Sequence, residues 1–309
     1  MATPNSLRQL QYLVALADKL NFTRAAEACF VTQSTLSAGL RELEAVLGTR
    51  LVERTRQTVL MTRIGLEVAT RARVILAATQ DLADVAAEAR PPMAGLLRLG
   101  VIPTVAPFVL PPTLESLRER YSKLRLALRE DLTANLLARI EEGQLDMALI
   151  ALPFDTGNLR VEPLFEDELW VVGRSDDSLF KANSVSVTPS LTDRLLLLEE
   201  GHCLRDHALY ACDVSSIHST ESIEATSLLT LVQMVISGLG VAMVPAMALK
   251  SGLAKSDQLV SRPMSKPRPK RTIALVTRRS TSRLTELKAL AEVILKVSRH
   301  SGGAIPGRS

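Results

Sequence analysis

The stretch that decides the fold of the N-terminal part is residues 22–48, which read FTRAAEACFVTQSTLSAGLRELEAVLG. A helix that Ser6 can cap precedes it, and Thr23 can cap a second, short helix inside it. Thr32 is placed to cap a third helix, which Gly48 ends because glycine readily adopts the left-handed conformation. The buried stripe expected on this third helix is Leu36, Leu40, Leu43 and Leu47. A short helix, a tight turn and an amphipathic helix with a polar first turn form the helix-turn-helix pattern.

The polar face of the third helix carries short hydrogen-bonding side chains that can reach base edges, and an arginine that can bind a phosphate. The candidate DNA-contacting residues there are Thr32, Gln33, Ser34, Thr35, Ser37 and Arg41. Taken alone, they fit a solvated surface equally well. Residues 50–61 alternate as a hairpin does, with Arg54 and Arg56 near its tip. A basic wing of this kind can bind the backbone beside the groove, which favours double-stranded DNA as the partner.

A long helix is predicted next, from about Arg63 to Ala89, with Thr62 as its cap and the prolines at 91 and 92 as its stop. Its apolar stripe consists of Ile64, Val68, Ala72, Ile75, Leu76, Leu82, Ala83 and Ala86. A stripe of this length on a helix that leaves a small domain needs a partner surface. The same helix of a second chain would supply it, giving a dimer that presents two reading helices to two half-sites.

These motifs resemble the N-terminal domain of LysR-type transcriptional regulators. The resemblance is carried by residues 22–27, 32–37, 43–48 and 51–54. It implies a winged helix-turn-helix, a dimerising linker helix and a C-terminal effector domain, and therefore a regulator rather than an enzyme. The chain departs from the family pattern at Ser37-Ala38-Gly39, where many relatives carry a larger polar or basic residue after the serine. Because these residues lie on the third helix, this departure bears on which DNA bases the helix recognises.

The composition is that of a globular protein of about two domains, with 309 residues, 47% of them hydrophobic and 23% charged. Three cysteines exclude a disulfide scaffold, and aromatic residues at 3% argue against a base-stacking platform. The N-terminus lacks a secretory signal pattern, which predicts a cytoplasmic protein. Residues 225–249 carry no charge, but Gln233, Pro245 and a Ser-Gly-Leu-Gly turn interrupt them. A helix and a buried strand are therefore expected there, not a membrane span.

The formal net charge of +4 hides a division along the chain. Residues 1–90 carry +2, residues 91–261 carry −8 and residues 262–309 carry +10. The basic surplus of the first part is weak for a DNA-binding domain, so charge alone does not establish DNA binding. The basic run 266–271 looks like a nucleic-acid patch, but its prolines and the strand that follows favour a solvated loop entering a core.

Beyond residue 92, short apolar strands alternate with helices, as in a parallel sheet with covering helices. Strands are expected at 96–101, 124–128, 145–150, 169–172, 195–198, 241–244 and 272–276, and helices near 108–120, 133–142 and 284–298. The family resemblance implies two lobes like those of a periplasmic binding protein. The chain is expected to cross between these lobes near 164–167 and 266–271.

The fold class expected is therefore an α/β effector domain of two lobes, preceded by an all-α winged helix-turn-helix domain and a long linker helix. The expected boundaries are 1–62 for the DNA-binding domain, 63–92 for the linker, and 93–300 for the effector domain, with lobe I about 93–165 plus 269–300 and lobe II about 166–268. Ligands of such sheets bind in the crevice outside the strand carboxyl ends. Thr104 and Thr133 fall where that crevice is expected, although each could be only a helix cap.

Residues 201–213, which read GHCLRDHALYACD, follow one of the predicted strands. The segment offers four nitrogen and sulfur metal ligands, namely His202, Cys203, His207 and Cys212. Their spacing is unlike that of paired chelating loops, and adjacent His and Cys are awkward for one tetrahedral ion, so no metal is expected. A second interpretation is a pair of buried structural thiols. The third is a thiol switch, in which Cys203 begins a helix whose N–H groups favour the thiolate, with Arg205 nearby.

A thiolate oxidised by peroxide becomes a sulfenic acid, which a second thiol can capture as a disulfide. If the segment between Cys203 and Cys212 is helical, its nine steps span roughly 13 Å, beyond the ~7 Å Cα limit for a disulfide. The bond then requires the helix to unwind and refold. Oxidation of one sulfur would thereby become a change of backbone shape.

The segment is similar to the redox centre of the peroxide-sensing activators within the LysR-type family, and the similarity includes residues 102–105, 226–228 and 271–276. By that likeness Cys203 is the peroxidatic cysteine and Cys212 the resolving one. The residues implied to bind peroxide or to organise its surroundings are Thr104, Thr133, His202, Arg205 and Asp206. His207 stands where the likeness leads us to expect glutamine. Because histidine titrates near neutral pH, this departure bears on how the reactivity of Cys203 depends on pH.

The leading hypothesis is a transcription factor that senses hydrogen peroxide through a Cys203–Cys212 disulfide, activates antioxidant genes and recruits RNA polymerase. The likeness implies a homotetramer, whereas periodicity supports only pairing, and no cofactor is implied. One alternative is a LysR-type regulator that answers a small organic effector, with incidental cysteines. Others are a thiol peroxidase, in which the DNA-reading pattern has no place, and a solute-binding protein, which would need an export signal.

Overall fold

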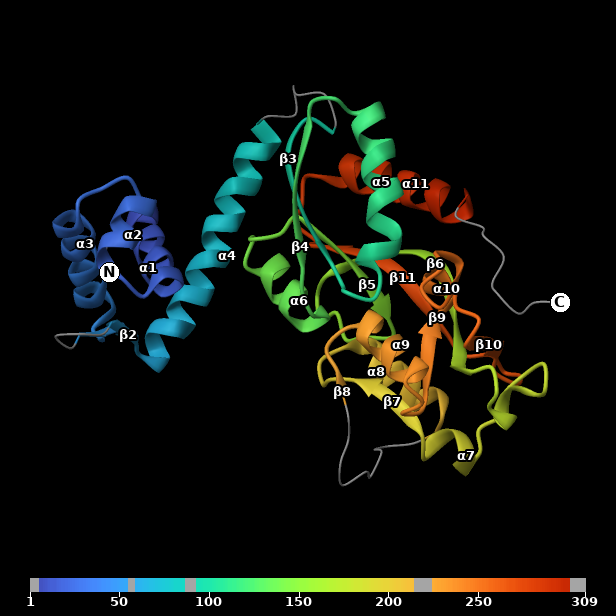
Figure 1. Ribbon diagram of the computed structural model, residues 1–309. Helices are drawn as coiled ribbons and strands as arrows, with labels where there is room; N and C mark the ends of the chain where they lie inside the picture. Colours follow the sequence, from blue (N-terminus) through green and yellow to red (C-terminus); the bar gives the residue numbers. More distant parts are fainter. Residues whose placement is uncertain (1–5, 55–58, 87–92, 214–223, 301–309) are drawn as a thin grey trace. The chain divides into compact units, whose positions relative to one another are not determined.

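The computed structural model describes residues 6–54, 59–86, 93–213 and 224–300 (Figure 1). Contacts divide the chain into two compact units, residues 1–89 with 141–144, and the remainder. Each unit is treated by itself below. None of the helices in the described ranges is both long and apolar enough to cross a membrane.

The first unit begins with three helices whose starts are fixed by side-chain caps. Helix α1 (Leu7–Lys19) has Ser6 as its cap, α2 (Phe22–Ala28) has Asn21, and α3 (Gln33–Leu47) has Thr32. The prediction that Thr23 caps the second helix is wrong. Asn21 has an extended backbone and its side chain accepts the Arg24 N–H at 3.0 Å, so the helix begins two residues earlier than expected.

Gly48 ends α3 in the left-handed conformation, with φ of 66°, as predicted. The core of the unit consists mainly of Leu10, Leu13, Leu16, Leu36, Leu40, Leu43 and Leu51. Gly39 is required where α3 crosses α1, because a Cβ atom there would lie 2.8 Å from the ring of Tyr12. The glycine therefore brings the third helix close to the first.

A short antiparallel hairpin follows, made of β1 (Val52–Arg54) and β2 (Val59–Met61). The Glu44 carboxylate accepts the backbone N–H groups of Leu51 and Val52 at 2.8 and 3.1 Å, which attaches the start of this wing to α3. Arg56 lies outside the described residues, and the side chain of Arg54 is likewise not described. Their place on the wing stays a prediction.

Helix α4 (Arg63–Ala86) starts at Thr62, whose hydroxyl accepts the Gly65 N–H at 2.9 Å. Its apolar positions divide into two sets. Ala69 and Ala72 are buried in the core of the first unit, with Val68 and Leu76 packed beside them. The exposed set contains Ile64, Leu66, Val74, Ile75 and Leu82. The expected stripe is therefore only partly available to a partner chain, and pairing through this helix stays a prediction.

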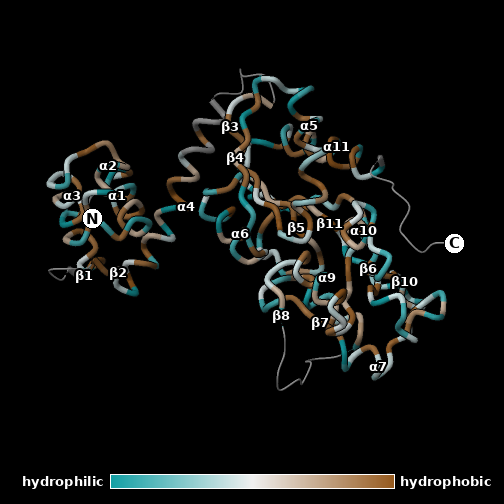
Figure 2. Tube along the Cα trace, viewed as in Figure 1, coloured by the Kyte–Doolittle hydropathy of each residue, from teal (hydrophilic) through white to brown (hydrophobic). Residues whose placement is uncertain are grey.

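The second unit is built on one mixed sheet of nine strands, in the order β4-β3-β5-β11-β6-β9-β7-β8, with β10 also paired to β6. The strands are β3 (Gly95–Val101), β4 (Leu124–Glu130), β5 (Met147–Leu152), β6 (Arg160–Arg174), β7 (Leu195–Leu198), β8 (Glu224–Ala225), β9 (Val241–Pro245), β10 (Leu259–Pro263) and β11 (Lys270–Thr277). Strands β5, β7 and β9 are almost wholly hydrophobic and buried (Figure 2).

The expected parallel sheet is found only within each half of this sheet. Strand β3 runs parallel to β4 and β5, and β7 runs parallel to β8 and β9. Strand β6 pairs antiparallel with β11 up to Glu168 and with β9 from Leu169 onward. The sheet is mixed because the chain passes from one half to the other along β6 and returns along β11.

Two hydrophobic clusters, one in each half, give the second unit its two lobes. The helices over the first half are α5 (Ala106–Arg120), α6 (Thr133–Glu141) and α11 (Leu284–His300). Those of the second half are α7 (Pro189–Thr192), α8 (Cys203–Ala211), α9 (Leu228–Ile236) and α10 (Ala246–Lys250), with a short 3-10 turn at Ser178–Phe180. The predicted fold class, two α/β lobes after a winged helix-turn-helix and a long helix, is confirmed.

Candidate functional site

A small pocket lies where three strands end. Its lining residues are Ile102, Pro103, Thr104, Leu132, Thr133, Gly201, His202 and Cys203. They follow the carboxyl ends of β3, β4 and β7, which is the edge where ligands of α/β sheets bind. The space among these side chains is about 160 Å³ with the adjoining solvent included, and it encloses no cavity the size of a water molecule. The pocket therefore has no room for an ordinary organic ligand, and even a very small molecule requires the lining side chains to move apart.

Position 201, in the lining of this pocket, requires glycine for steric reasons. Gly201 has φ of 92°, in the left-handed region, and a Cβ atom there would lie 2.9 Å from a methyl group of Leu132. Leu132 thus packs against the backbone just before α8. This contact joins the start of α6, in the first lobe, to the start of α8, in the second.

Cys203 is the first residue of α8 and is only 3% exposed. Burial raises the pKa of its thiol above the usual value, while the Arg271 cation and the Thr133 hydroxyl act to lower it. Asp206, on the same helix, adds to the rise. The net direction is opposite to the lowered pKa expected for a cysteine at a helix start, because removal from water outweighs the favourable groups. The resting residue is a buried thiol.

The cation that acts on this thiol is Arg271, which is not among the predicted site residues. Its side chain is fully buried, and its guanidinium donates to the Asp167 carboxylate at 3.1 Å, the Thr104 hydroxyl at 2.9 Å and the Thr104 carbonyl at 3.2 Å. Residue 271 ends the basic run that was expected to be a solvated loop. That expectation is wrong for Arg271, because β11 begins at Lys270 and carries the arginine into the core.

Asp167 connects this arginine to the second lobe. Its other carboxylate oxygen accepts the N–H of Met247, in the first turn of α10, at 3.0 Å. Burial raises the pKa of Asp167, and the adjacent Arg271 charge opposes that rise. Thr104, after β3, and Met247, in α10, are therefore held by one buried ion pair.

Two further pocket residues offer unused or neutral polar groups. The Thr133 hydroxyl is buried beside the Cys203 thiol, whose pKa it lowers, and has no conventional hydrogen-bond partner among the described residues. His202 is the residue before α8, but its side chain makes no capping hydrogen bond. Burial lowers the pKa of His202, although the Glu199 carboxylate, 3.7 Å from Nε2, opposes this. A neutral imidazole and a free hydroxyl suit a small polar ligand such as water or a peroxide.

Arg205 is not placed at the thiol. Its guanidinium donates to the Leu198 carbonyl at 2.9 Å and to the Glu224 carboxylate at 2.6 Å, and so attaches α8 to the ends of β7 and β8. The structure thus brings together Thr104, Thr133, His202 and Cys203, with Arg271 in addition. Asp206 influences the thiol electrically, whereas Arg205 positions the helix.

Cys212 lies at the other end of α8 and belongs to the hydrophobic cluster of the second lobe, whereas Cys203 belongs to that of the first. Both thiols are free, and burial raises the pKa of Cys212 as well. The helix over Cys203–Ala211 separates their Cα atoms by roughly 13 Å, so a disulfide between them requires α8 to unwind.

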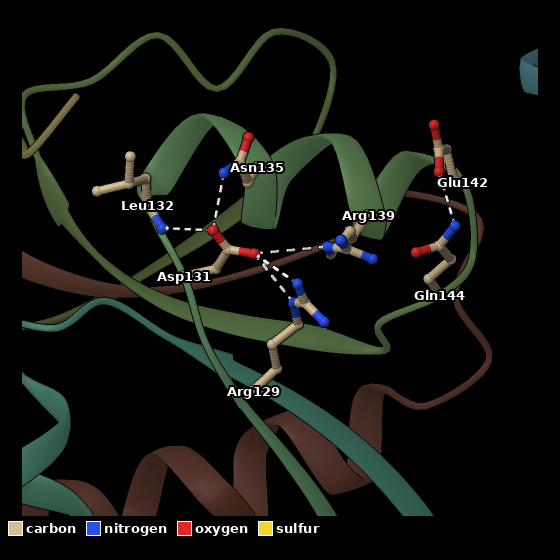
Figure 3. Close-up of polar contacts among 7 residues, drawn as sticks. All are labelled: Arg129, Asp131, Leu132, Asn135, Arg139, Glu142 and Gln144. Atoms are coloured by element: carbon tan, nitrogen blue, oxygen red, sulfur yellow. Dashed lines mark hydrogen bonds and ion pairs between the residues drawn. The ribbon is translucent and has the colours of Figure 1, made fainter. Parts of the chain in front are cut away.

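A polar network holds the start of α6, which carries Thr133 (Figure 3). One carboxylate oxygen of Asp131 accepts the Leu132 N–H at 3.0 Å and the Asn135 amide at 2.7 Å. The other oxygen accepts the Arg129 side chain at 3.0 Å and lies 3.7 Å from that of Arg139. Asp131 therefore joins the end of β4 to α6 and fixes the backbone that presents Thr133 to the pocket.

An Asp131→Ala variant is expected to lose about 1 to 2 kcal/mol of unfolding free energy, because several hydrogen bonds to one carboxylate are removed together. Partial burial acts to raise the pKa of Asp131, but hydrogen bonds from Asn135 and Arg129 hold it below the usual value. The stabilisation is thus present at neutral pH and is lost as the pH falls through the lowered pKa. Urea unfolding of both proteins should show a difference that shrinks in acid; a constant difference would contradict this assignment.

The predicted DNA-contacting residues occupy the first turns of α3. The Thr32 hydroxyl accepts the Thr35 N–H at 3.2 Å and lies 2.9 Å from that of Ser34, so Thr32 also has a structural role. Gln33 and Arg41 are exposed, and Ser37 is half-buried. The surface is available to a ligand, and the DNA contacts stay predictions.

The described part of the chain contains no cluster of three or more His, Cys, Asp and Glu side chains placed to hold a metal ion.

Comparison with known proteins places this geometry in a family. Residues 7–66 match the family described as bacterial regulatory helix-turn-helix protein, lysR family, and residues 91–299 match the LysR substrate binding domain. The regulator EstR of Acinetobacter baylyi is 43% identical over 299 residues, covering 96% of this chain and 99% of EstR. The transcriptional dual regulator OxyR of Escherichia coli is 37% identical over 289 residues, covering 94% of each chain.

Solved structures of OxyR proteins have the same fold. A full-length OxyR variant from Pseudomonas aeruginosa has a TM-score of 0.79 at 33% identity and covers 94% of this chain and 98% of its own. A peroxide-bound OxyR variant from Corynebacterium glutamicum has a TM-score of 0.66 at 31% identity, with 97% and 95% covered. With both domains matched over nearly their whole length, this chain belongs to the LysR family of bacterial transcriptional regulators.

Proposed function

We propose that this regulator senses hydrogen peroxide at the Cys203 pocket and converts the oxidation into a change of transcription. The observation that carries the proposal is a buried thiol whose pKa both the Thr133 hydroxyl and the buried Arg271 cation act to lower, in a pocket too small for an ordinary organic effector. OxyR proteins with matching folds, one of them bound to peroxide, support it.

In the proposed reaction peroxide occupies the pocket beside Cys203. Arg271 donates to the Thr104 oxygen, which leaves the Thr104 hydroxyl hydrogen free to donate to a peroxide oxygen. Thr133 offers a second hydroxyl. The sulfur attacks one peroxide oxygen, an S–O bond forms and the O–O bond breaks, and the departing oxygen takes the thiol proton to leave as water. Cys203 becomes a sulfenic acid, and peroxide is reduced by two electrons.

The second step joins the two cysteines. Cys212 attacks the sulfenic sulfur, water leaves, and a Cys203–Cys212 disulfide forms. Because α8 keeps these residues apart, the bond requires this helix to lose its present form, which also breaks the attachment of Arg205 to β7 and β8. Two lobe cores that each contain one of the cysteines would then be rearranged.

The output of this switch is DNA binding by the helix-turn-helix domain at promoter half-sites. The partners proposed are a second copy of the chain through α4, a tetramer by likeness to the family, and RNA polymerase. As a regulator, the protein needs only one oxidation per switching event. A thiol peroxidase would instead turn over repeatedly with a reductant.

The proposal is tested by mass spectrometry of the reduced full-length protein after treatment with peroxide. The expected product is a peptide pair joined through Cys203 and Cys212, with Cys29 still free. Cys29 lies in the first unit, with its sulfur 3.9 Å from the Gln11 carbonyl, and serves as the internal control. Oxidation of Cys29 with both other cysteines unmodified would refute the assignment.

A second candidate is a LysR-type regulator that answers a small organic effector, and it is kept because EstR, at 43% identity, is named as a transcriptional regulator without reference to peroxide. In that case the reduced protein should gain thermal stability with such a ligand, since a ligand that binds only the folded state stabilises it. A thermal-shift screen of the C203S variant and the reduced wild type separates the two candidates. Peroxide sensing predicts no stabilising organic ligand in either protein.

A further inference from the structure

A buried histidine on the cysteine helix is not used by the mechanism above. His207, on α8, is only 8% exposed. Its Nε2 atom lies 3.2 Å from the carbonyl oxygen of Pro153, in the segment after β5. Its Nδ1 atom is fully buried and has no hydrogen-bond partner among the residues that the structure describes. A buried nitrogen without a partner costs free energy and calls for an explanation.

The contact with Pro153 fixes the state of the ring. A carbonyl oxygen can only accept a hydrogen bond, so Nε2 must carry the hydrogen. Burial lowers the pKa of His207 and outweighs the hydrogen bond to the Pro153 carbonyl, which acts to raise it; the Arg271 charge lowers the pKa further, and Asp206 opposes this. The imidazole is therefore neutral at neutral pH. In a neutral ring protonated at Nε2, Nδ1 carries a lone pair. His207 therefore holds a buried proton acceptor without an occupant.

Helix geometry places this acceptor on the same face as the reactive thiol. Cys203 and His207 are four residues apart, so their side chains lie one above the other, about 6 Å apart along the helix axis. Helical side chains lean toward the N-terminus, which directs the residue at the later position over the earlier one. Arg271 and Asp206 both act electrically on Cys203 and on His207, which indicates that the two share one charged environment.

We propose that His207 accepts the proton of the Cys203 thiol through Nδ1 when the sulfur attacks peroxide. This inference rests on the function proposed above. As the S–O bond forms, the proton passes from sulfur to Nδ1 through one intervening water molecule, and the imidazolium then gives it to the departing hydroxide, which leaves as water. The sum is one thiol and one peroxide converted to one sulfenic acid and one water, and the histidine returns to its neutral form.

The charged and titratable groups around His207 determine the pH range of this role. Cys203 and Asp206 lie on its own helix, and Arg271 comes from β11. The segment after β5 offers the Pro153 carbonyl, and its Asp155 accepts the Gly157 N–H instead. Strand β7, which packs against α8, carries only leucines. The neutral base is thus present from neutral pH upward and is lost in acid, below its lowered pKa.

The test is the rate of Cys203 oxidation by peroxide in the reduced full-length protein, measured by mass spectrometry between about pH 5.5 and 9.5, a span that includes the ordinary His and Cys pKa values. The matched variant is H207Q, because a glutamine amide can still donate to the Pro153 carbonyl but cannot take a proton. Wild type should be nearly independent of pH above neutrality. H207Q should be about 100-fold slower at pH 7, rise steeply with pH and approach wild type at high pH.

Two further results decide between a proton acceptor and a structural residue. Added imidazole should restore part of the rate of H207A at neutral pH, and the restored rate should itself decline in acid. Equal pH profiles for wild type and H207Q, or a loss in H207Q that is constant at every pH, would overturn the role of His207 and leave peroxide sensing standing. Failure of wild-type Cys203 to react at any pH would overturn the sensing function itself.

Discussion

A C203S variant is expected to bind its promoter DNA normally and to give no transcriptional response to hydrogen peroxide. Serine has nearly the shape of cysteine, so the buried position at the start of α8 is filled and the fold is retained. Its hydroxyl cannot form a sulfenic acid, and without that product Cys212 has no partner to attack. The transcriptional response to peroxide should therefore be lost completely.

The measurement combines a promoter-fused reporter under graded peroxide with gel shifts of the purified protein. C29S is the matched control, because it removes a thiol from the first unit and leaves the pocket unchanged; its response should equal that of wild type. C212S should still form the sulfenic acid but stop there. A C203S protein that still responds to low peroxide would show that sensing occurs elsewhere.

The parts of the fold predicted well are those that local chemistry decides. Ser6, Thr32 and Gly48 act within a few residues of themselves, and the helix boundaries they set agree with the structure. Thr23 failed as a cap because Asn21 caps the helix two residues earlier, through the Arg24 N–H, which leaves Thr23 inside the helix; sequence spacing does not decide between the two caps. The mixed sheet was missed because the direction of β6 and β11 depends on how the chain returns between lobes, a long-range property.

The candidate site likewise contains residues that local sequence predicts and residues that only the long-range fold brings together. Thr104 and Thr133 were expected at one crevice because both follow strand ends, and parallel strands end at one edge, whereas their grouping with Cys203 came from the family resemblance. Arg271 and Asp167 are separated by 104 residues and meet only in the folded sheet. A signal was present, since a single arginine opening an apolar strand needs a buried acid, but nothing in the sequence identified which acid. The raised pKa of Cys203 likewise depends on burial that only packing reveals.

The buried arginine leads to the second large effect. An R271M variant leaves the Asp167 carboxylate buried without its cation, and the breaking of such a pair by loss of one partner costs about 3 to 5 kcal/mol of stability. It also removes the positive charge that opposes the rise in the pKa of Cys203. Each unit by which that pKa rises lowers the thiolate fraction at neutral pH about tenfold.

These two consequences can be separated with a second variant. In D167N/R271M the uncompensated charge is gone, and the asparagine oxygen can still accept the Met247 N–H, so most of the lost stability should return in urea unfolding. The rate of Cys203 alkylation by iodoacetamide at neutral pH should stay low in both variants, since neither has the cation. If the alkylation rate recovers together with stability, Arg271 only holds the lobes in place. If stability recovers alone, the arginine acts on the thiol directly.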